Sequence, residues 1–321
     1  MAGRGSGRDF SFSFVELNCE NLFDCVHDSL KDDHEFLPDG MRHWTFGRYW
    51  RKLNNIAREI VACGGEGEDW KKPNLVALVE VENDSVLTML TKHSLLKKAH
   101  YEYVMTNSPD ERGVDVALLY DAQSFTLQNS YAIRVPMPES HRPTRDILYA
   151  KGSTVNAAGT AMQDLHVFVV HAPSRSGGET ASEPYRLLVS NKLCEHIDSI
   201  RSQQPDARII VAGDFNDYHN NKSVVQLSEH SLFNVSANAQ GTHGAKGTYR
   251  YRGEWGSLDQ ILVSETMRNE WQTVTCEIFD APFLCVEDEK FGGPKPRRTY
   301  NGPKYDGDGF SDHLPLVVRF Y

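Results

Sequence analysis

Apolar and polar residues follow one another along the chain in blocks whose spacing separates strands from helices. The pattern predicts strands over Ser11–Leu17, Leu75–Val79, Val114–Tyr120, Leu165–Val170, Ile209–Ala212, Leu258–Val263 and Leu314–Phe320. Nearly continuous apolar runs mark those at 75–79, 165–170 and 209–212 as buried. Apolar residues three or four positions apart predict helices over Gly47–Cys63, Val86–Leu96 and Glu183–Ile200. Strands that alternate with helices in this way predict layers of the α/β class.

The chain of 321 residues is longer than a usual single domain, but an α/β fold with two sheets and long loops can occupy that length. Apolar blocks recur from Phe10 to the last residue, and no low-complexity linker divides them. We therefore expect one domain over residues 10–321. The glycine- and arginine-rich residues 1–9 are expected to form a flexible N-terminus.

Targeting signals are not evident in the sequence. It has no run of 18 apolar residues, which predicts no transmembrane segment, and Met1–Arg8 lacks the apolar centre of a signal peptide. We expect a cytoplasmic protein by default, or a secreted one if a leader was removed beforehand. The six cysteines form no C-x-x-C pair and are interpreted as buried thiols, with a Cys276–Cys285 disulfide as the alternative in an oxidising compartment.

The segment Val211–Asn216 carries the sharpest chemical signal. A buried strand runs into Gly213, and Asp214 and Asn216 then lie two positions apart. In extended backbone, both side chains would point to the same side and form a polar face. The alternative is a turn in which the two side chains satisfy backbone groups.

Polar residues also adjoin other predicted strands. Asp312 and His313 precede the last strand, Glu80 and His171 directly follow buried strands, and Asp259 begins one. A carboxylate is a ligand for hard cations, and an imidazole moves protons near neutral pH. An isolated Asp-His pair is more often structural, so the case for a functional site rests on the other polar residues beside strands. Together they predict one site at the strand ends.

The chemistry of these residues favours a metal-dependent phosphoryl reaction. Oxygen ligands without thiolates favour Mg²⁺ or Mn²⁺ over zinc, and a cation held by few side chains keeps room for a phosphate oxygen. Phosphoryl transfer needs such a cation to offset developing charge, a group that orients water, and an acid or base.

Six motifs in order give the chain a family resemblance. They are Leu-Asn-Cys-Glu-Asn around Asn18, Leu-Val-Glu-Val-Glu-Asn around Glu80, Val-Val-His-Ala-Pro-Ser around His171, then Gly-Asp-Phe-Asn, Ser-Leu-Asp-Gln-Ile and Ser-Asp-His. This order resembles the endonuclease/exonuclease/phosphatase superfamily over residues 12–320. The resemblance implies a four-layer α/β sandwich, in which two mixed β-sheets pack face to face with helices outside.

The resemblance also implies roles for residues. Glu80 and Asp312 would hold the cation with Asn18 nearby, while Asp214 and Asn216 would position or activate water and bind phosphate. His313 would act as acid or base, with Asp259 as its orienting partner. His171 stands where deoxyribonuclease-like members have a second catalytic histidine. Whether His313 or Asp214 deprotonates water stays open.

Four arginines are candidates for holding substrate. Arg145 matches the position of a phosphate-contacting arginine in deoxyribonuclease-like members, and Arg175 follows His171 by four residues. The alternative for both is an ion pair with Asp146 or another acid. Arg250 and Arg252 alternate with tyrosines, as a rim for nucleotides would. Trp50, in a similar mixture of cations and aromatics, is predicted to lie in the core instead.

These observations favour a nuclease or other phosphodiesterase acting on nucleic acid or a small phosphodiester. The net charge of −10 argues mildly against a large basic surface for long nucleic acid. A phosphomonoesterase or inositol-phosphate phosphatase is the first alternative, with cations supplied by Lys290–Arg298. These residues belong to the Glu287–Gly309 segment, which is expected to be a surface loop near the site. A sphingomyelinase-like phospholipase and a binding module without catalysis are the others. Nothing in the sequence indicates the oligomeric state.

Overall fold

The computed structural model describes residues 12–65, 67–155 and 161–321. The predicted flexible N-terminus at residues 1–9 and the first residue of the predicted strand Ser11–Leu17 lie outside these ranges. Among the described residues, none of the helices is long and apolar enough to cross a bilayer.

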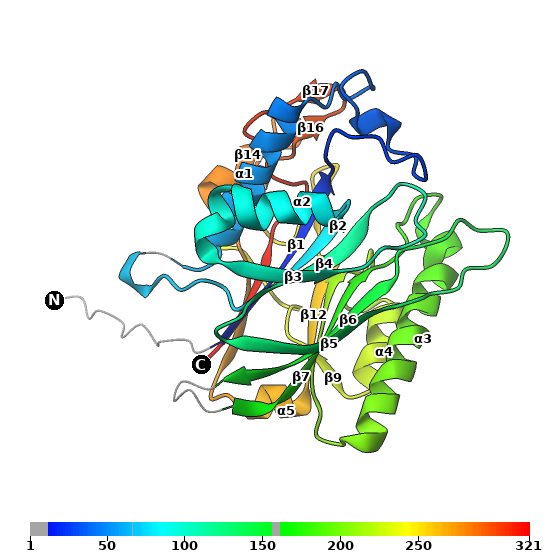
Figure 1. Ribbon diagram of the computed structural model, residues 1–321, viewed down its shortest axis with the longest axis vertical. Helices are drawn as coiled ribbons and strands as arrows, with labels where there is room; N and C mark the ends of the chain where they lie inside the picture. Colours follow the sequence, from blue (N-terminus) through cyan, green and yellow to red (C-terminus); the bar gives the residue numbers. More distant parts are fainter. Residues whose placement is uncertain (1–11, 66, 156–160) are drawn as a thin grey trace.

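Two six-stranded sheets form the middle of the molecule (Figure 1). The first has the order β13 (Val274–Ile278), β18 (Leu316–Phe320), β1 (Phe12–Leu22), β2 (Leu75–Val81), β4 (Asp115–Asp121) and β3 (Tyr101–Met105). The second has the order β5 (Phe125–Ile133), β6 (Ile147–Val155), β7 (Ala161–His171), β8 (Arg208–Asp214), β12 (Asp259–Ser264) and β9 (Leu232–Asn234). Each has one central parallel pair, β1 with β2 and β7 with β8, flanked by antiparallel pairs, so both sheets are mixed.

Helices cover the outer face of each sheet (Figure 1). On the first sheet lie α1 (Phe46–Ala62) and the short α2 (Asp84–Thr88), and on the second lie α3 (Glu179–Gln203) and α4 (Lys222–Glu229), with α5 (Glu265–Asn269) following β12. Single turns of helix occur at His34–Phe36, Gly67–Asp69, Met89–His93, Leu95–Ala99 and Pro282–Leu284. The predicted four-layer α/β sandwich is therefore confirmed.

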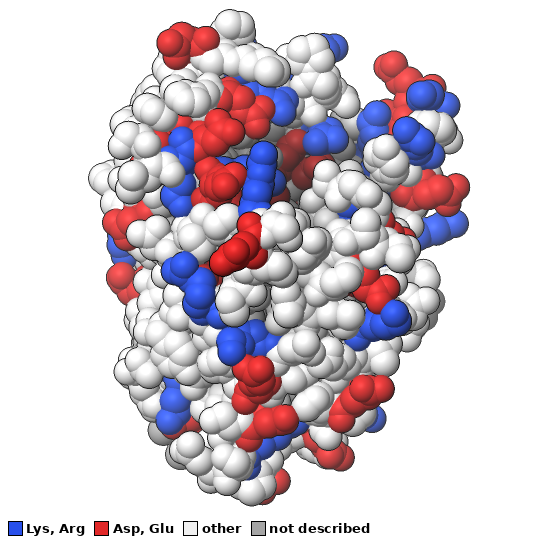
Figure 2. All heavy atoms as spheres, turned by 90° about the vertical axis from the view of Figure 1, so that its right-hand side faces the viewer, with Lys and Arg blue, Asp and Glu red and all other residues white. Residues whose placement is uncertain are grey.

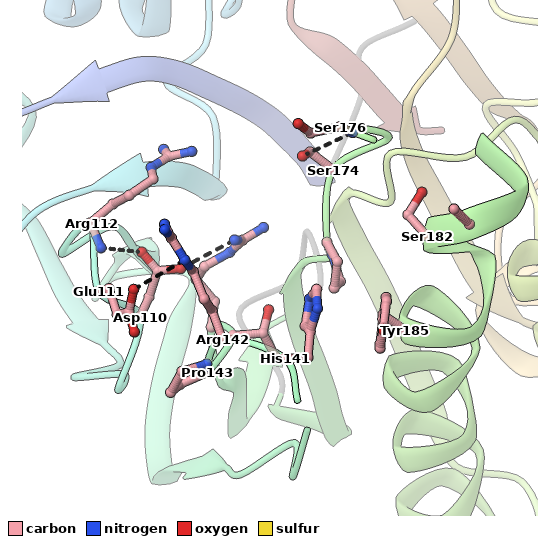
Figure 3. A pocket seen from close by; sticks show the side chains of 14 residues that line it. Asp110, Glu111, Arg112, His141, Arg142, Pro143, Ser174, Ser176, Ser182 and Tyr185 are labelled. Carbon is pink, nitrogen blue, oxygen red and sulfur yellow. Dashed lines mark hydrogen bonds and ion pairs between the residues drawn. The ribbon is translucent and has the colours of Figure 1, made fainter. Parts of the chain in front are cut away.

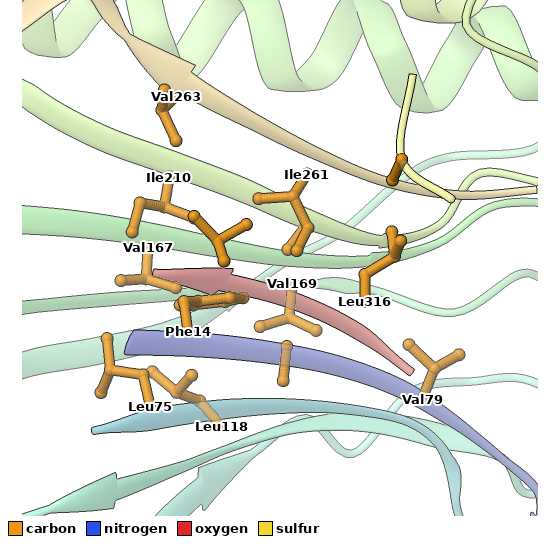
Figure 4. Packing of buried hydrophobic residues seen from close by; sticks show 14 of the residues in the cluster. Phe14, Leu75, Val79, Leu118, Val167, Val169, Ile210, Ile261, Val263 and Leu316 are labelled. Atoms are coloured by element: carbon orange, nitrogen blue, oxygen red, sulfur yellow. The ribbon is translucent and has the colours of Figure 1, made fainter. Parts of the chain in front are cut away.

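Three layers of apolar side chains hold the four layers of backbone together. The central one fills the space between the sheets, where Phe14 and Leu75 of the first sheet meet Val167 and Ile210 of the second (Figure 4). A second cluster lies under α1 and a third under α3 and α4. Trp50 is only partly buried, but it packs against the cluster under α1, as expected.

The predicted helix Val86–Leu96 is wrong beyond Thr88 as a regular α-helix. The α-helix ends at Thr88, and a π-turn and a 3₁₀ turn follow. Two hydroxyls bond to carbonyls one turn earlier, Thr91 to Leu87 and Ser94 to Leu90. Such bonds compete with regular helix geometry.

Three small hairpins extend from the sandwich. They are β10 (Tyr249–Tyr251) with β11 (Glu254–Gly256), β14 (Cys285–Glu287) with β15 (Pro294–Pro296), and β16 (Tyr300–Asn301) with β17 (Lys304–Tyr305). The Glu287–Gly309 segment, expected to be a loop, thus contains much of two hairpins. All six cysteines are free thiols, so the Cys276–Cys285 disulfide is not formed.

Candidate active site

The two sheets bring the ends of several strands to one edge of the sandwich. His171 ends β7 and is level with Asp214 at the end of β8, because these strands are parallel. Asp259 begins the antiparallel β12 directly opposite Asp214. The partner sheet contributes Asn18, whose Nδ2 donates to Asp214 Oδ2 at 3.2 Å. The predicted strand-end residues therefore meet across the two sheets.

A cleft of about 870 Å³ opens at this edge. Of the twelve predicted site residues, ten line it: Asn18, Glu80, Arg145, His171, Arg175, Asp214, Asn216, Arg252, Asp312 and His313. Asp259 lies behind His313, which it contacts. Arg250, the twelfth, does not line the cleft. It bonds to backbone carbonyls and not to any other of the twelve predicted residues.

Glu80 reaches the cleft because its backbone departs from the strand. Its φ of 63° lies in the left-handed region, and the pairing of β2 shifts register between Val79 and Val81. A bulge of this kind turns one side chain away from the regular alternation. The strained conformation is held in part by a hydrogen bond from the Asn21 amide to Glu80 Oε2 at 2.9 Å.

A tight turn presents Asp214 and Asn216. Gly213 has a φ of 142°, and a Cβ there would lie 1.9 Å from the carbonyl oxygen of Val170. Asn216 has a φ of 49°, and its amide donates to Asp214 Oδ1 at 2.7 Å. The extended backbone that the sequence suggested is therefore wrong at Asn216, and the turn alternative describes the geometry. Both residues nevertheless line the cleft.

His313 and Asp259 form a buried pair. Asp259 Oδ2 lies 2.7 Å from His313 Nδ1, and Asp259 Oδ1 is buried with no partner among the described residues. Burial lowers the pKa of His313, but the charge and hydrogen bond of Asp259, followed by Asp214 and Asp312, outweigh it and leave the pKa well above its usual value. His313 is thus held as an imidazolium, with Nδ1 bound to Asp259.

The second histidine has the opposite electrostatic environment. Burial, then the charges of Arg145 and Arg112, lower the pKa of His171 well below its usual value, so this ring is neutral. Its Nε2 lies 3.7 Å from Glu80 Oε1 and 3.8 Å from Asp214 Oδ2. Burial and then the charge of Asp259 raise the pKa of Asp214 to about 7. The cleft therefore holds one charged and one neutral imidazole beside a carboxyl group that titrates near neutrality.

Comparison with known proteins identifies the family of the chain. Residues 13–321 match the model of the Endonuclease/Exonuclease/phosphatase family. The chain belongs to this family. The match confirms the family resemblance seen in the sequence, and it indicates a hydrolase of phosphoester bonds. No curated protein matches the chain.

Solved structures share the endonuclease/exonuclease/phosphatase fold along most of the chain. A conserved protein of unknown function from Enterococcus faecalis is 16% identical, covers 96% of this chain and 98% of its own, and has a TM-score of 0.58. Truncated Caenorhabditis elegans TDP2 is 14% identical, and the match covers 97% of this chain and 98% of its own, with a TM-score of 0.58. The human Nocturnin catalytic domain, solved with a bound sulfate, is 18% identical, and the match covers 97% of this chain and 94% of its own, with a TM-score of 0.54. At these identities the likeness establishes the fold.

The carboxylates of this family member fit a hard cation. Glu80 Oε2 and Asp312 Oδ2 accept hydrogen bonds, from Asn21 and Arg298, while the second oxygen of each accepts none among the described residues. Two sets of possible ligand atoms lie within 4.8 Å of one another among the described residues: His27, Asp33 and His34 away from the cleft, and Asp214, Asp259 and His313 at it. With oxygen donors on both sides of the cleft and no thiolate in its lining, the donor set suits Mg²⁺ or Mn²⁺.

Arg145 and Arg175 line the cleft, but protein groups occupy much of each guanidinium. Arg145 contacts Asp110 at 3.3 Å and the Ala172 carbonyl at 2.7 Å, and its Nε is buried without a partner among the described residues. Asp146, the partner considered from the sequence, pairs with Arg134 instead. Arg175 is bound more completely, by Asn216 O, Asp217, Glu179 and Asn221.

Arg250 and Arg252 differ sharply although they are two residues apart. The guanidinium of Arg250 donates to backbone carbonyls of residues 253 and 292–294, which ties the β10–β11 hairpin to the β14–β15 hairpin. Arg252 lines the cleft with its guanidinium 5.1 Å from the Tyr251 ring. Arg252 is therefore positioned to meet a ligand, whereas the role of Arg250 as a substrate-binding residue has no contact in its favour.

Sequence reasoning missed Arg112. It lines the cleft, donates to Asn21 Oδ1 at 3.0 Å and lies 3.5 Å from Glu80 Oε1. It precedes β4, whose start lies beside the end of its antiparallel neighbour β2. The sequence indicates Asp259 because it lies at the start of a predicted strand, whereas Arg112 lies before one, so only the pairing of β2 with β4 brings it to the site.

Proposed function

We propose that this family member is a divalent-metal-dependent phosphodiesterase, a nuclease acting on DNA or RNA. The observation that carries the proposal is the pair of His313 and Asp259, placed beside Asp214 in a cleft that also offers the oxygen donors Glu80 and Asp312. A proton donor held in its charged form next to oxygen ligands is what cleavage of a phosphodiester requires.

Each residue has a part in this proposal. Glu80 and Asp312, with Asn18 nearby, would hold Mg²⁺ or Mn²⁺, which when bound offsets the charge that develops on the phosphate. Asp214 and Asn216 orient the attacking water, and the carboxylate of Asp214 accepts the proton that the water loses as it attacks phosphorus. His313, oriented by Asp259, gives its proton to the leaving oxygen, and the neutral His171 offers a hydrogen bond to a phosphate oxygen. Arg145 and Arg252 add positive charge.

The charges around the cleft favour a diester over a monoester. Three of the five cations of the Glu287–Gly309 segment are paired with acids: Lys295 with Asp288, Arg297 with Asp306, and Arg298 with Glu20 and Asp312. None of that segment's cations lines the cleft. A dianionic monoester would need more uncompensated charge there than a monoanionic diester. The face seen in Figure 2 likewise has basic and acidic side chains intermixed rather than one broad basic patch.

The experiment compares three substrates with the wild-type chain and two variants. A single-stranded oligonucleotide, bis(p-nitrophenyl) phosphate and p-nitrophenyl phosphate are incubated with Mg²⁺, Mn²⁺ or chelator. We expect both diesters to be cleaved, and we expect chelator to abolish this cleavage. His313→Ala should lower kcat by about 10²–10⁴-fold, the usual worth of a general acid. Glu80→Gln should raise the Mg²⁺ concentration needed for half-maximal rate.

Other outcomes reject the proposal in distinct ways. Phosphate release from the monoester, with both diesters intact, would indicate a phosphatase. Full activity in chelator would remove the metal from the proposal. The matched control is His219→Ala, which alters an exposed histidine outside the cleft lining and should leave kcat unchanged.

A further inference from the structure

A second cavity of about 550 Å³ adjoins the active-site cleft (Figure 3). The two share four lining residues: Arg112, Arg145, Ser174 and Ser176. Its volume lies in the range of roughly 300–1,000 Å³ that is usual for ligand sites. A molecule bound in the cleft can therefore continue into this cavity.

The walls come from three separate loops and one helix. Asp110, Glu111 and Arg112 precede β4, His141 and Arg142 lie between β5 and β6, and Ser174 follows β7, with Tyr185 on α3 (Figure 3). Elements from both sheets thus close around the same space. A cavity built this way has a shape that the fold itself maintains.

The cavity has an aromatic wall. The rings of His141 and Tyr185 are stacked, with centroids 3.7 Å apart and planes 12° apart, and both side chains are partly exposed. The pair is displayed at the cavity rather than buried in a core. A flat, partly exposed stack of rings is suited to receive another flat ring, and every nucleobase has one.

The cavity also has a cationic wall. Its three arginines face two acids, and Arg145 already pairs with Asp110. Arg142 is 78% exposed and lies 3.4 Å from Glu111, which is itself 51% exposed. Such an exposed contact contributes little, so Arg142 can exchange it for a phosphate at small cost. The charge left over suits one phosphodiester anion.

We propose that this second cavity binds the nucleotide next to the scissile phosphate, with its unpaired base on the His141–Tyr185 stack and its phosphate at Arg142. The substrate class is then single-stranded nucleic acid, because a base inside a duplex is not free to stack on a side chain. This inference rests on the proposed function and adds the part of the substrate beyond the scissile bond.

The test compares a substrate that fills both spaces with one that fills the cleft alone. The first is a single-stranded oligonucleotide of ten residues and the second is bis(p-nitrophenyl) phosphate, with a duplex of the same sequence as a third. Tyr185→Ala should lower kcat/KM for the single strand about 5- to 150-fold, the range for loss of one base-aromatic stack. Hydrolysis of the small diester should stay within twofold, because Tyr185 does not line the cleft.

Matched variants separate stacking and charge from a general structural effect. Tyr185→Phe keeps the ring and should restore the single-strand rate. Arg142→Ala should make the dependence of the oligonucleotide KM on salt shallower by about one in a log-log plot, as loss of one phosphate contact does. Arg268→Ala removes the same charge from a side chain that packs on Phe233, outside both cavities, and should leave that slope unchanged.

The outcomes distinguish failure of the proposed function from failure of the proposal for the second cavity. If the wild-type chain cleaves neither diester, the proposed function is wrong. If it cleaves both, but Tyr185→Ala lowers both rates equally or neither, the second cavity has no role in binding the strand. Equal cleavage of duplex and single strand would overturn the assignment of an unpaired base.

Discussion

Replacing Glu59 by glutamine should change how the stability of the protein depends on pH. Glu59 lies on the inner face of α1 and is fully buried, and neither carboxyl oxygen has a hydrogen-bond partner among the described residues. Burial raises its pKa from 4.5 to about 8, an effect that Lys52 reduces and Glu20 increases. The folded chain therefore keeps a proton on Glu59 that the unfolded chain releases.

The direction follows from proton linkage. Stability due to the neutral carboxyl group is fully present below pH 4.5 and is lost as the pH rises toward 8, because only the unfolded state then gains by ionising. Each unit between the two pKa values is worth about 1.4 kcal/mol, so the whole interval of 4.5 to about 8 corresponds to about 5 kcal/mol as an upper bound. Glu59→Gln removes this dependence.

The assay is urea unfolding of the wild type and of Glu59→Gln at each pH from 4 to 9, with chelator present. The difference in unfolding free energy should move in favour of the variant by several kcal/mol between pH 5 and pH 8. Titrating groups that do not interact with Glu59 are common to both chains and cancel. Glu68→Gln, at an exposed position, should run parallel to the wild type. A difference that stays constant with pH would refute the reasoning about Glu59.

Two further substitutions test the site. Asp259→Asn removes the main charge that keeps His313 protonated, so burial should then lower the pKa of His313 and kcat should fall about 10²–10⁴-fold at neutral pH; an unchanged rate would contradict this pairing. Gly213→Ala places a Cβ against the Val170 carbonyl and should cost more than about 3 kcal/mol in unfolding experiments. Gly302→Ala, at a φ of 60° with open space, should cost only about 1–2 kcal/mol, and equal losses would argue against a steric cause.

Much of the site could be predicted because it lies where strands end. His171 and Asp214 each follow an apolar run, and in a sheet with a parallel pair their ends must be adjacent. The same logic places Asp259 on the antiparallel neighbour. What the pattern could not indicate is local conformation: Glu80 points into the cleft through a bulge, and Asn216 through a left-handed residue.

The different positions of Arg250 and Arg252 show a second limit of prediction from the sequence. Both lie in the same alternation of cations and aromatics, but Arg252 has a φ of 51° in the turn before Gly253, which separates its direction from that of Arg250. Three of the four carbonyls that bind Arg250 belong to residues 42 to 44 positions later. Such contacts between distant loops depend on tertiary packing that spacing does not encode.

Strands without an apolar signature were also missed. β5 is at the edge of the second sheet, and most of its residues are exposed or partly exposed, so no continuous apolar run marks it. The β5–β6 connection nevertheless supplies His141, Arg142 and Arg145. The β5–β6 connection, which the sequence pattern did not predict, thus forms a wall of the second cavity.

In the proposed function, Glu80 and Asp312 hold a divalent cation in the cleft beside His313. Crystals soaked in Mn²⁺ test it directly through anomalous scattering. We expect one strong peak within about 2.0–2.3 Å of a carboxylate oxygen of both Glu80 and Asp312, absent in Glu80→Gln crystals. A peak confined to other residues, or none at millimolar Mn²⁺, would contradict the claim.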